Sequence, residues 1–508
     1  MRKSGIILPI FSLPSNYGIG TFGKEAYKFV DFLEKAKETF WQILPIGPTS
    51  YGDSPYQSFS TFAGNPYFID LEVLSEGGLL EKSQIEKFNF GNDENNIDYG
   101  IMYESRYKVL KIAFKNKNES YEKKLKEFKD LNKYWIFDYA LFMAIKDYNN
   151  GVSWNNWDKD IKFRKPEAMK KYSDLLKEEI EFHVFLQFLF YKQWIELKNY
   201  ANKKGVKIIG DIPIYVAEDS SDIWANTRLF MLDDELFPKK VSGCPPDLFS
   251  ATGQLWGNPI YNWKQLNKEG YNWWIKRVKA SLELFDVIRI DHFRGFESYW
   301  TIPYGDKTAV NGQWEKGPGI EVFDAIKKEL GEIDVIAEDL GYITKEVREL
   351  LNKCNYSGMK VMQFAFDPKG DSEYLPHNYD KNTVVYTGTH DNDTIKGWFS
   401  ALSKEEKEFC KKYTGMKNKD DNWTFIKSAI SSVADTAIIQ MQDVLNSGEE
   451  ARINLPSTIG TNWKWRMNKY DMSDELANKL KDINETYRRY TKRSGLNEKE
   501  QINKFDTK

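Results

Sequence analysis

The chain has 508 residues, of which 41% are hydrophobic and 29% are charged, and its formal net charge at pH 7 is −3. A balance this close to neutral gives no reason to expect a nucleic-acid partner or an anionic membrane surface as a partner. The length suggests several domains, although one large barrel with insertions also reaches it.

The N-terminal segment is expected to belong to the mature protein. Its apolar patch is interrupted by Pro9 and Pro14, and no cleavage site of the signal-peptide type follows it. The most apolar stretch, 182–191, is far shorter than the roughly 20 residues of a membrane span, so it predicts a core helix and a protein without a membrane partner. The three cysteines are widely separated and none lies in a CxxC motif, which favours a reduced, cytoplasmic location.

Six short apolar runs are followed directly by polar or acidic residues and predict β-strands. Their apolar residues are continuous rather than alternating, which is typical of parallel strands covered on both faces. Helical patterns lie between most of them, including 344–354 and 403–413, the latter opened by a capping box of Ser403 and Glu406. The predicted strand segments are 40–48, 206–214, 285–291, 334–341, 359–367 and 383–393.

This alternation of strands and helices leaves two architectures, an open doubly wound sheet and a closed (β/α)8 barrel. Asp211, Asp291, Glu338 and Asp391 each lie at or near the C-terminal end of a different predicted strand. A barrel gathers those ends on one face, where its active sites lie, whereas an open sheet would spread some of them apart. We therefore predict an α/β fold, a (β/α)8 TIM barrel with helical and loop insertions that forms one catalytic domain over 1–508.

Three segments depart from the alternation. Residues 75–200 are rich in Lys and Glu and predict a helical insertion with a solvated surface, or alternatively an arm that binds a partner. Residues 241–263 combine glycine, proline and aromatic residues without periodicity, which predicts a functional loop such as a substrate-binding lid. The Lys-rich tail, 488–508, is expected to be frayed.

Two carboxylates at predicted strand ends suit opposite roles in catalysis. Arg289 and Asp291 are two residues apart in a strand and share a face, so the guanidinium is expected to lower the pKa of Asp291 and keep it anionic, as a nucleophile must be. Glu338 follows an apolar run at 335–337, and desolvation there would raise its pKa to about 6, as a general acid requires. Both residues could instead form ordinary structural ion pairs.

Asp391 is the third candidate carboxylate. It follows His390 and a run of small residues, 387–389, which leave room for a ligand. The sequence HDND at 390–393 also contains metal-ligand types, but the chain has only four histidines, which argues against a metal site.

Together these residues are the parts of a retaining glycosidase, in which one carboxylate attacks the anomeric carbon and another first protonates the leaving oxygen and then acts as a base. Sugar rings also need aromatic platforms, and Tyr51, Tyr56 and Trp256 lie in loops rich in glycine and proline. Three classes of function stay open on these residues: a transglycosylase, an α-glucan hydrolase with the same carboxylates, and a non-catalytic glucan-binding protein.

Six motifs resemble those of one family, the 4-α-glucanotransferases of the amylomaltase or disproportionating-enzyme type (glycoside hydrolase family 77). The similarity runs in order from about Gly5 to Trp465. The motifs are LPIGPTSYGDSPYQSFSTFAGNPYFID, GDIPIYVAEDSSDIW, GCPPDLFSATGQLWGNPIYNW, RIDHFRG, AEDLG and YTGTHDNDT.

The resemblance implies a (β/α)8 barrel without a cofactor that transfers a 1,4-α-glucan segment to the 4-hydroxyl of an acceptor sugar. Maltooligosaccharides and 1,4-α-glucans would be both donors and acceptors, as in glycogen or starch metabolism. It implies Asp291 as the nucleophile, Glu338 as the acid/base and Asp391 as the stabiliser of the transition state. The residues implied in sugar binding are Tyr51, Asp211, Trp256, Arg289, His292, His390 and Asn454, the last within a segment, 453–466, that resembles the last barrel segment of the family.

Overall fold

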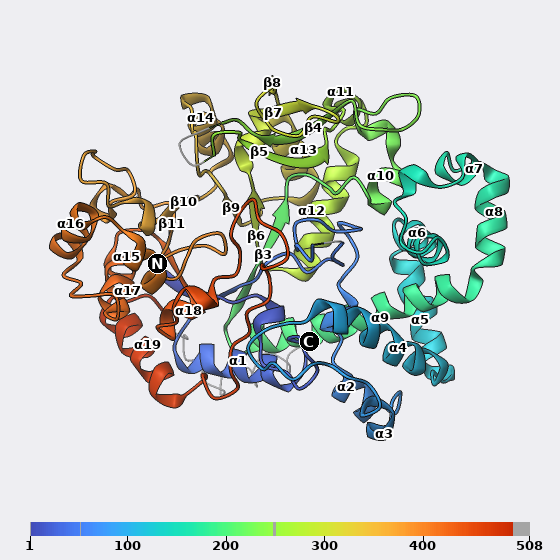
Figure 1. Ribbon diagram of the computed structural model, residues 1–508, viewed down its shortest axis with the longest axis horizontal. Coiled ribbons are helices and arrows are strands. Elements are labelled where there is room, and N and C mark those ends of the chain that lie inside the picture. Colours follow the sequence, from blue (N-terminus) through green and yellow to red (C-terminus); the bar gives the residue numbers. More distant parts are fainter. Residues whose placement is uncertain (1, 51, 247–249, 491–508) are drawn as a thin grey trace, which may run out of the picture.

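The computed structural model describes residues 2–50, 52–246 and 250–490. Within them, eight strands form a sheet in which all neighbouring strands run parallel, in the order β10-β11-β12-β1-β2-β3-β6-β9 (Figure 1). The strands are β1 (Lys3–Ile7), β2 (Phe40–Gln42), β3 (Lys207–Pro213), β6 (Val287–Asp291), β9 (Val335–Ala337), β10 (Gly358–Val361), β11 (Thr383–Tyr386) and β12 (Thr436–Gln440).

The two ends of this sheet meet and close the barrel. Ile336 of β9 forms a parallel bridge with Ser357, which lies directly before β10. The amide of Ala337 donates to the carbonyl of Ser357 over 2.9 Å, and the amide of Ser357 donates to the carbonyl of Val335 over 3.3 Å. The predicted (β/α)8 barrel is therefore confirmed.

All six predicted strand segments contain barrel strands, but two strands were not predicted. β1 lies in the N-terminal apolar patch, which is too short and too near the chain start to show a pattern of its own. β12 follows helix α17 by four residues and is equally brief. The expectation that 453–466 forms the last barrel segment is wrong, because that segment contains no strand and β12 is the last strand of the barrel.

Helices cover the outside of the barrel, and the predicted helical segments are among them. Ser403 caps α16 and forms the predicted capping box with Glu406, and 344–354 contains α14. The helices outside 75–200 are α1 (Lys24–Lys35), α2 (Leu71–Glu76), α10 (Ser221–Ala225), α11 (Trp263–Lys268), α12 (Asn272–Leu284), α13 (Ile320–Leu330), α14 (Lys345–Cys354), α15 (Ile395–Ala401), α16 (Lys404–Thr414), α17 (Asn422–Ser431), α18 (Met441–Val444) and α19 (Asp474–Thr486).

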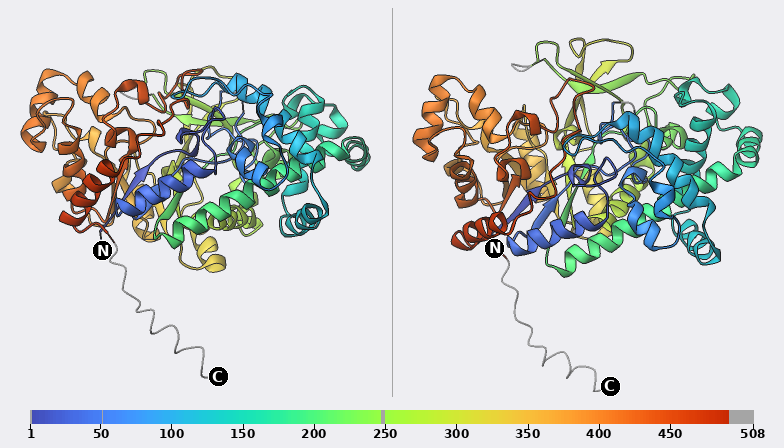
Figure 2. Two further views of the ribbon diagram at one scale, coloured as in Figure 1. Left: turned by 90° about the horizontal axis from the view of Figure 1, so that it is seen from below. Right: turned by 60° about the horizontal axis from the view of Figure 1, so that its bottom comes forward.

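The segment 75–200 is helical and lies on one flank of the barrel (Figures 1 and 2). Its last helix, α9, belongs to the barrel as much as to the insertion, since it packs against α1 and β3. The indole of Trp194 in α9 is fully buried and donates to the carbonyl of Leu284 at the end of α12 over 3.0 Å. The helices are α3 (Lys82–Ile85), α4 (Tyr99–Lys115), α5 (Glu119–Leu131), α6 (Ile136–Tyr148), α7 (Lys159–Lys162), α8 (Pro166–Leu175) and α9 (Lys177–Lys203).

The segment 241–263 is not the wholly irregular loop that its composition suggests. It contributes two strands to a small antiparallel sheet of order β5-β4-β7-β8, beside the barrel (Figure 1). A register shift between Val241 and Gly243 and the mixed exposure of β5 hide the alternation that would have revealed these strands. The strands are β4 (Lys240–Cys244), β5 (Gln254–Pro259), β7 (Ser298–Pro303) and β8 (Gln313–Lys316).

The start of the predicted frayed tail is packed. Arg489 is fully buried, and its guanidinium donates to the carbonyls of Lys3 over 2.9 Å and Ser432 over 3.0 Å, where β1 begins and α17 ends. These two backbone carbonyls thus fix the position of Arg489 beside the start of β1. Residues 491–508 lie outside the described residues. No helix in the described ranges is long and apolar enough to cross a membrane.

Candidate active site

The site is built at the carboxyl ends of β3, β6 and β9 and in the loop after β11. Asp211 and Arg289 are register partners on neighbouring strands. Arg289 Nη1 bonds Asp211 Oδ2 at 2.5 Å and Asp291 Oδ1 at 3.1 Å, so one guanidinium joins both carboxylates. The side chains of Arg289 and Asp211 are 4% and 0% exposed, whereas that of Asp291 is 28% exposed and accessible to a ligand.

The pKa of Asp291 differs from the sequence-based expectation. Burial, and to a smaller extent the nearby Asp211 carboxylate, raise it to about 6 against the opposing effect of Arg289. The expectation that Arg289 would leave it lowered is wrong, because burial outweighs the effect of Arg289, whose charge is also shared with Asp211. Asp291 is still mainly anionic at neutral pH.

Glu338 is held by the backbone next to Asp291. Its Oε2 accepts from the amide of His292 at 2.6 Å, and its Oε1 accepts from the amide of Leu340 at 3.2 Å. His292 adopts a left-handed φ of 52°, a conformation that few residues other than glycine adopt. Burial, and next the charge of Asp291, raise the pKa of Glu338 to about 7, so this carboxyl can carry a proton at neutral pH.

Asp391 lies in a different electrostatic environment. Burial would raise its pKa, but His390 and Asn454 more than offset this and lower it to about 2. His390 Nε2 is 3.2 Å from Asp391 Oδ2, and Asn454 Nδ2 donates to Asp391 Oδ1 over 2.6 Å. Arg452 donates to the Asp391 carbonyl over 2.7 Å and fixes the turn. Asp391 is therefore a permanent anion, 44% exposed toward the site.

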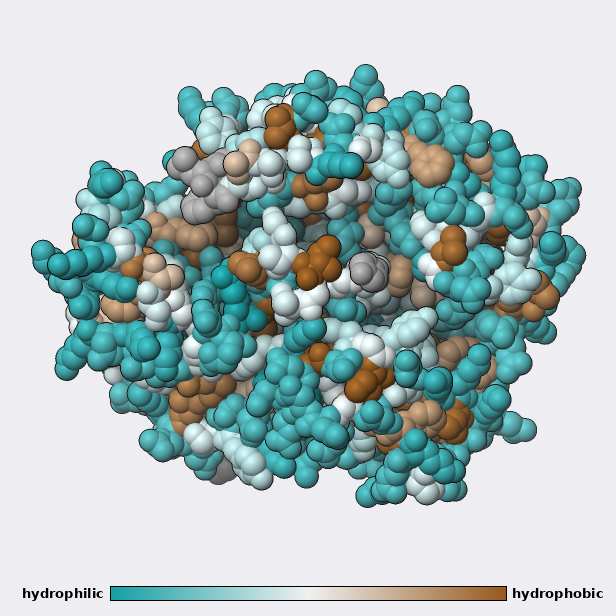
Figure 3. Space-filling model, in the orientation of Figure 1, coloured by the Kyte–Doolittle hydropathy of each residue, from teal (hydrophilic) through white to brown (hydrophobic). Residues whose placement is uncertain are grey.

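Aromatic rings line the same region. The hydroxyl of Tyr56 donates to Asp211 Oδ2 over 2.8 Å, and its ring stacks on His390 with centroids 5.1 Å apart. Trp256 of β5 contacts the ring of His292 edge-on, with centroids 4.7 Å apart. Tyr51 lies outside the described residues. Figure 3 shows a hollow near the centre of this face, where Figure 1 places β3, β6 and β9.

Sequence reasoning missed two residues that complete the site, Arg452 and Trp463. Tyr56, one of the three loop aromatics expected as sugar platforms, lies beside Asp211 and His390. Arg452 carried no signal, and Trp463, whose ring centroid is 6.0 Å from that of Tyr56, lies in the misassigned segment 453–466. No group of three or more His, Cys, Asp or Glu residues in the described part of the chain is arranged to hold a metal ion.

Asp211→Asn is expected to destabilise the protein by roughly 3 kcal/mol, because it leaves the buried Arg289 with half of its compensating charge. Urea unfolding of the variant measures this loss. Asp474→Asn is the control: it breaks an ion pair with Lys35 in which the Asp474 side chain is 86% exposed, and it should cost less than about 0.5 kcal/mol. Equal stabilities for the two variants would show that Arg289 does not need Asp211.

Comparison with known proteins agrees with this geometry. The family model described as 4-alpha-glucanotransferase matches residues 8–473. The chain belongs to the 4-α-glucanotransferase family. It is 55% identical over 483 residues to the 4-alpha-glucanotransferase of Clostridium butyricum, covering 94% of this chain and 99% of the relative. It is 45% identical over 500 residues to that of Thermus thermophilus, covering 96% and 99%.

A solved structure supports the same assignment. The amylomaltase from Streptococcus agalactiae, in complex with acarbose, superposes with a TM-score of 0.95 at 44% identity and covers 97% of this chain and 100% of its own. The expectations of a glycoside hydrolase family 77 barrel and of a 4-α-glucanotransferase enzyme are confirmed. The hydrolase and the non-catalytic binding protein are not favoured.

Proposed function

We propose that this 4-α-glucanotransferase works by double displacement, with Asp291 as its nucleophile. Glu338 protonates the glycosidic oxygen while the Asp291 carboxylate attacks the anomeric carbon, which gives a covalent glycosyl-enzyme and frees the leaving glucan. Glu338, now anionic, then takes the proton from the 4-hydroxyl of an acceptor sugar, whose oxygen displaces Asp291. The observation that carries this proposal is a partly exposed carboxylate paired with Arg289 that lies beside a buried carboxyl, Glu338, whose pKa burial raises to about 7.

We assign charge stabilisation and sugar binding to the residues around this pair. Asp391, an anion at all working pH values, stabilises the positive charge that develops on the sugar ring in the transition state. The donor sugar contacts Arg289, His292, His390 and Asn454, with Tyr51 and Trp256 holding the glucan beyond it. The fully buried Asp211 positions Arg289.

The substrates in this proposal are maltooligosaccharides and longer 1,4-α-glucans, as donors and as acceptors. We place the reaction in cytoplasmic glycogen or starch metabolism. The free thiols of Cys354 and Cys410 are compatible with a reducing compartment.

With maltotriose as the only substrate, we expect glucose together with oligosaccharides longer than maltotriose, followed over time by chromatography. Water cannot lengthen a chain, so longer products require an attacking sugar hydroxyl. Glucose and maltose alone, rising in equal amounts, would show hydrolysis and contradict the proposal.

A further inference from the structure

The segment 387–395, which carries Asp391, is supported by buried polar side chains from the neighbouring strand end. It connects the end of β11 with the first residue of α15. Because β11 pairs in parallel with β12, Asp443 in the short helix α18 directly after β12 lies at the same end of the barrel (Figure 1). Asp443 is only 1% exposed, so a sugar bound in the site does not reach it.

The Asp443 carboxylate bonds both ends of this segment. Its Oδ2 accepts from the hydroxyl of Thr387 over 2.6 Å, and its Oδ1 accepts from the amide of Ile395 over 2.7 Å. Thr387 is the first residue after β11, and Ile395 is the first residue of α15. Asp391 lies midway between them in the sequence, so the two anchored ends limit where its carboxylate can lie.

Two glutamine side chains hold the same segment between its ends. Gln440, the last residue of β12, and Gln363 both donate to the carbonyl of Asp393, over 3.2 Å and 2.8 Å. Both glutamines are buried. A Cβ atom at Gly388 would collide with their amide nitrogens, so the backbone runs directly against them. The segment therefore rests on a set of buried polar groups that leaves it little room to shift.

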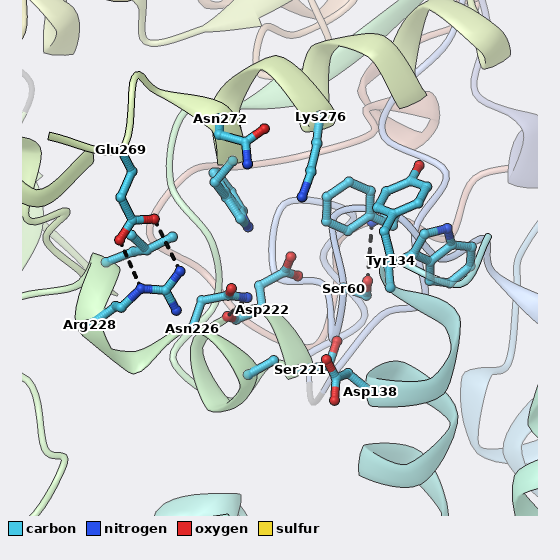
Figure 4. A pocket seen from close by; sticks show the side chains of 15 residues that line it. Ser60, Tyr134, Asp138, Ser221, Asp222, Asn226, Arg228, Glu269, Asn272 and Lys276 are labelled. Carbon is cyan, nitrogen blue, oxygen red and sulfur yellow. Dashed lines mark hydrogen bonds and ion pairs between the residues drawn. The ribbon is translucent and has the colours of Figure 1, made fainter. Parts of the chain in front are cut away.

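The same kind of bonding occurs at a buried carboxylate in another part of the molecule. Asp222, which lines the pocket shown in Figure 4, accepts from the amide of Thr61 over 2.8 Å and from its hydroxyl over 2.9 Å. Burying a carboxylate costs free energy that such hydrogen bonds offset, and the bonds in turn fix the backbone that donates them. The backbone that Asp443 fixes differs in that it carries a proposed catalytic group, Asp391.

We propose that Asp443 is a positioning residue for the transfer reaction, because it sets where the Asp391 carboxylate stands relative to the reacting sugar ring. The proposal rests on the role of Asp391 in the proposed function. An anion stabilises a developing positive charge best when it is already in place, since no reorganisation is then needed during the reaction. Asn454 and Arg452 hold Asp391 itself, and Asp443 holds the two ends of the segment that carries it.

Asp443→Ala in the full-length enzyme removes both of these bonds. We expect kcat for maltotriose disproportionation to fall about 30-fold, because a displacement of Asp391 by a fraction of an ångström weakens its interaction with the transition state. The apparent KM for maltotriose should stay within about twofold of the parent value, because no group that touches the sugar is removed. Initial rates of glucose release measure both quantities.

Asp70→Ala is the matched control for the loss of a buried carboxylate. Asp70 is buried and accepts from one backbone amide, that of Val73 over 3.0 Å, and from one threonine hydroxyl, that of Thr21 over 2.6 Å. The variant should keep the kcat of the parent. Both variants are assayed below the start of their unfolding transitions, as measured by circular dichroism.

A double variant separates positioning of Asp391 from a general structural role. Asp391→Asn alone is expected to lower kcat by about 10²–10³-fold. If Asp443 acts through Asp391, adding Asp443→Ala to Asp391→Asn should lower kcat by at most about threefold more. A further loss of about 30-fold in the Asp391→Asn background would overturn the proposal, because it would show that Asp443 acts independently of Asp391.

Thr387→Val gives a second reading with a smaller change, which also serves if Asp443→Ala does not fold. It removes one hydroxyl and keeps the bond from Asp443 to the amide of Ile395. We expect kcat to fall about fivefold in the parent and to stay unchanged in the Asp391→Asn background. An equal fall in both backgrounds would overturn the proposal.

The same measurements distinguish failure of this proposal from failure of the proposed function. An Asp391→Asn variant with the kcat of the parent would contradict the role of Asp391 in the proposed function, and the positioning role of Asp443 with it. A slow Asp391→Asn variant, together with Asp443→Ala and Thr387→Val variants as fast as Asp70→Ala, would contradict only the positioning role.

Discussion

Asp291→Ala is expected to lower the rate of maltotriose disproportionation by at least about 10⁴-fold, because it removes the atom that forms the covalent bond to the sugar. The fold should persist, since Arg289 keeps its buried ion pair with Asp211. Initial rates of glucose release measure the loss. Binding of maltooligosaccharides should stay close to that of the parent, because Asp291 is only one of many contacts.

Rescue by a small anion distinguishes a missing nucleophile from a damaged site. The methyl group of alanine leaves space where the carboxylate stood, and azide can attack the anomeric carbon there in one displacement. We expect a β-glycosyl azide, with the configuration inverted from the α-linked donor. An Asp291→Ala variant that keeps more than a few per cent of the parent rate without azide would contradict the assignment.

The barrel was predictable because its central strands are continuous apolar runs, each with a polar residue at its carboxyl end. Asp211, Asp291 and Glu338 marked where three strands stop, and a closed barrel is the architecture that gathers them. β1 and β12 were not predictable, because each spans only five residues; β1 has no polar residue at its carboxyl end, and β12 ends in Gln440 rather than in a carboxylate. Their identity as strands depends on pairing with partners distant in sequence, such as Lys3 with Thr436.

Contacts within the site were predictable where both residues lie in one strand or one motif, and less so where the fold brings together residues that are distant in sequence. Arg289 and Asp291 are two residues apart, so their contact follows from strand geometry. The pairing of Arg289 with Asp211 spans 78 residues. Burial, and after it the Asp211 carboxylate that the fold brings close, reverse the expected sign of the Asp291 pKa shift. Arg452 and Trp463 reach Asp391 and Tyr56 through an irregular segment whose path no periodicity reveals.

The pH dependence of the parent enzyme should have two limbs that belong to the pair of carboxyls. Asp291 acts as an anion, so activity is expected to fall as the pH drops below about 6, where it gains a proton. Glu338 acts first as an acid, so activity is expected to fall as the pH rises above about 7, where it has lost its proton. Rates of maltotriose disproportionation across pH 4 to about 9 measure both limbs, and a flat profile would contradict the assignments.

Glu338→Gln is expected to slow maltotriose disproportionation by about 10³-fold, because an amide cannot protonate the leaving oxygen. The amide keeps the shape of the side chain, and its one carbonyl oxygen can still accept from the His292 amide, the shorter of the two contacts, while the longer contact with the Leu340 amide is lost. The limb above about pH 7 should disappear from its profile, since the group that titrates there is gone. The fall in activity below about pH 6, which belongs to Asp291, should remain.

A glycosyl donor whose leaving group needs no proton distinguishes the role of Glu338 as an acid from its role as a base. With α-maltosyl fluoride the first displacement by Asp291 should proceed in Glu338→Gln, because fluoride leaves as an anion. The second displacement still lacks the carboxylate that takes the proton from the acceptor hydroxyl, so the glycosyl-enzyme should accumulate. Mass spectrometry would then find one maltosyl group on a peptide that contains Asp291. A variant that transfers from maltotriose and from the fluoride at equal rates would show that Glu338 is not the proton donor.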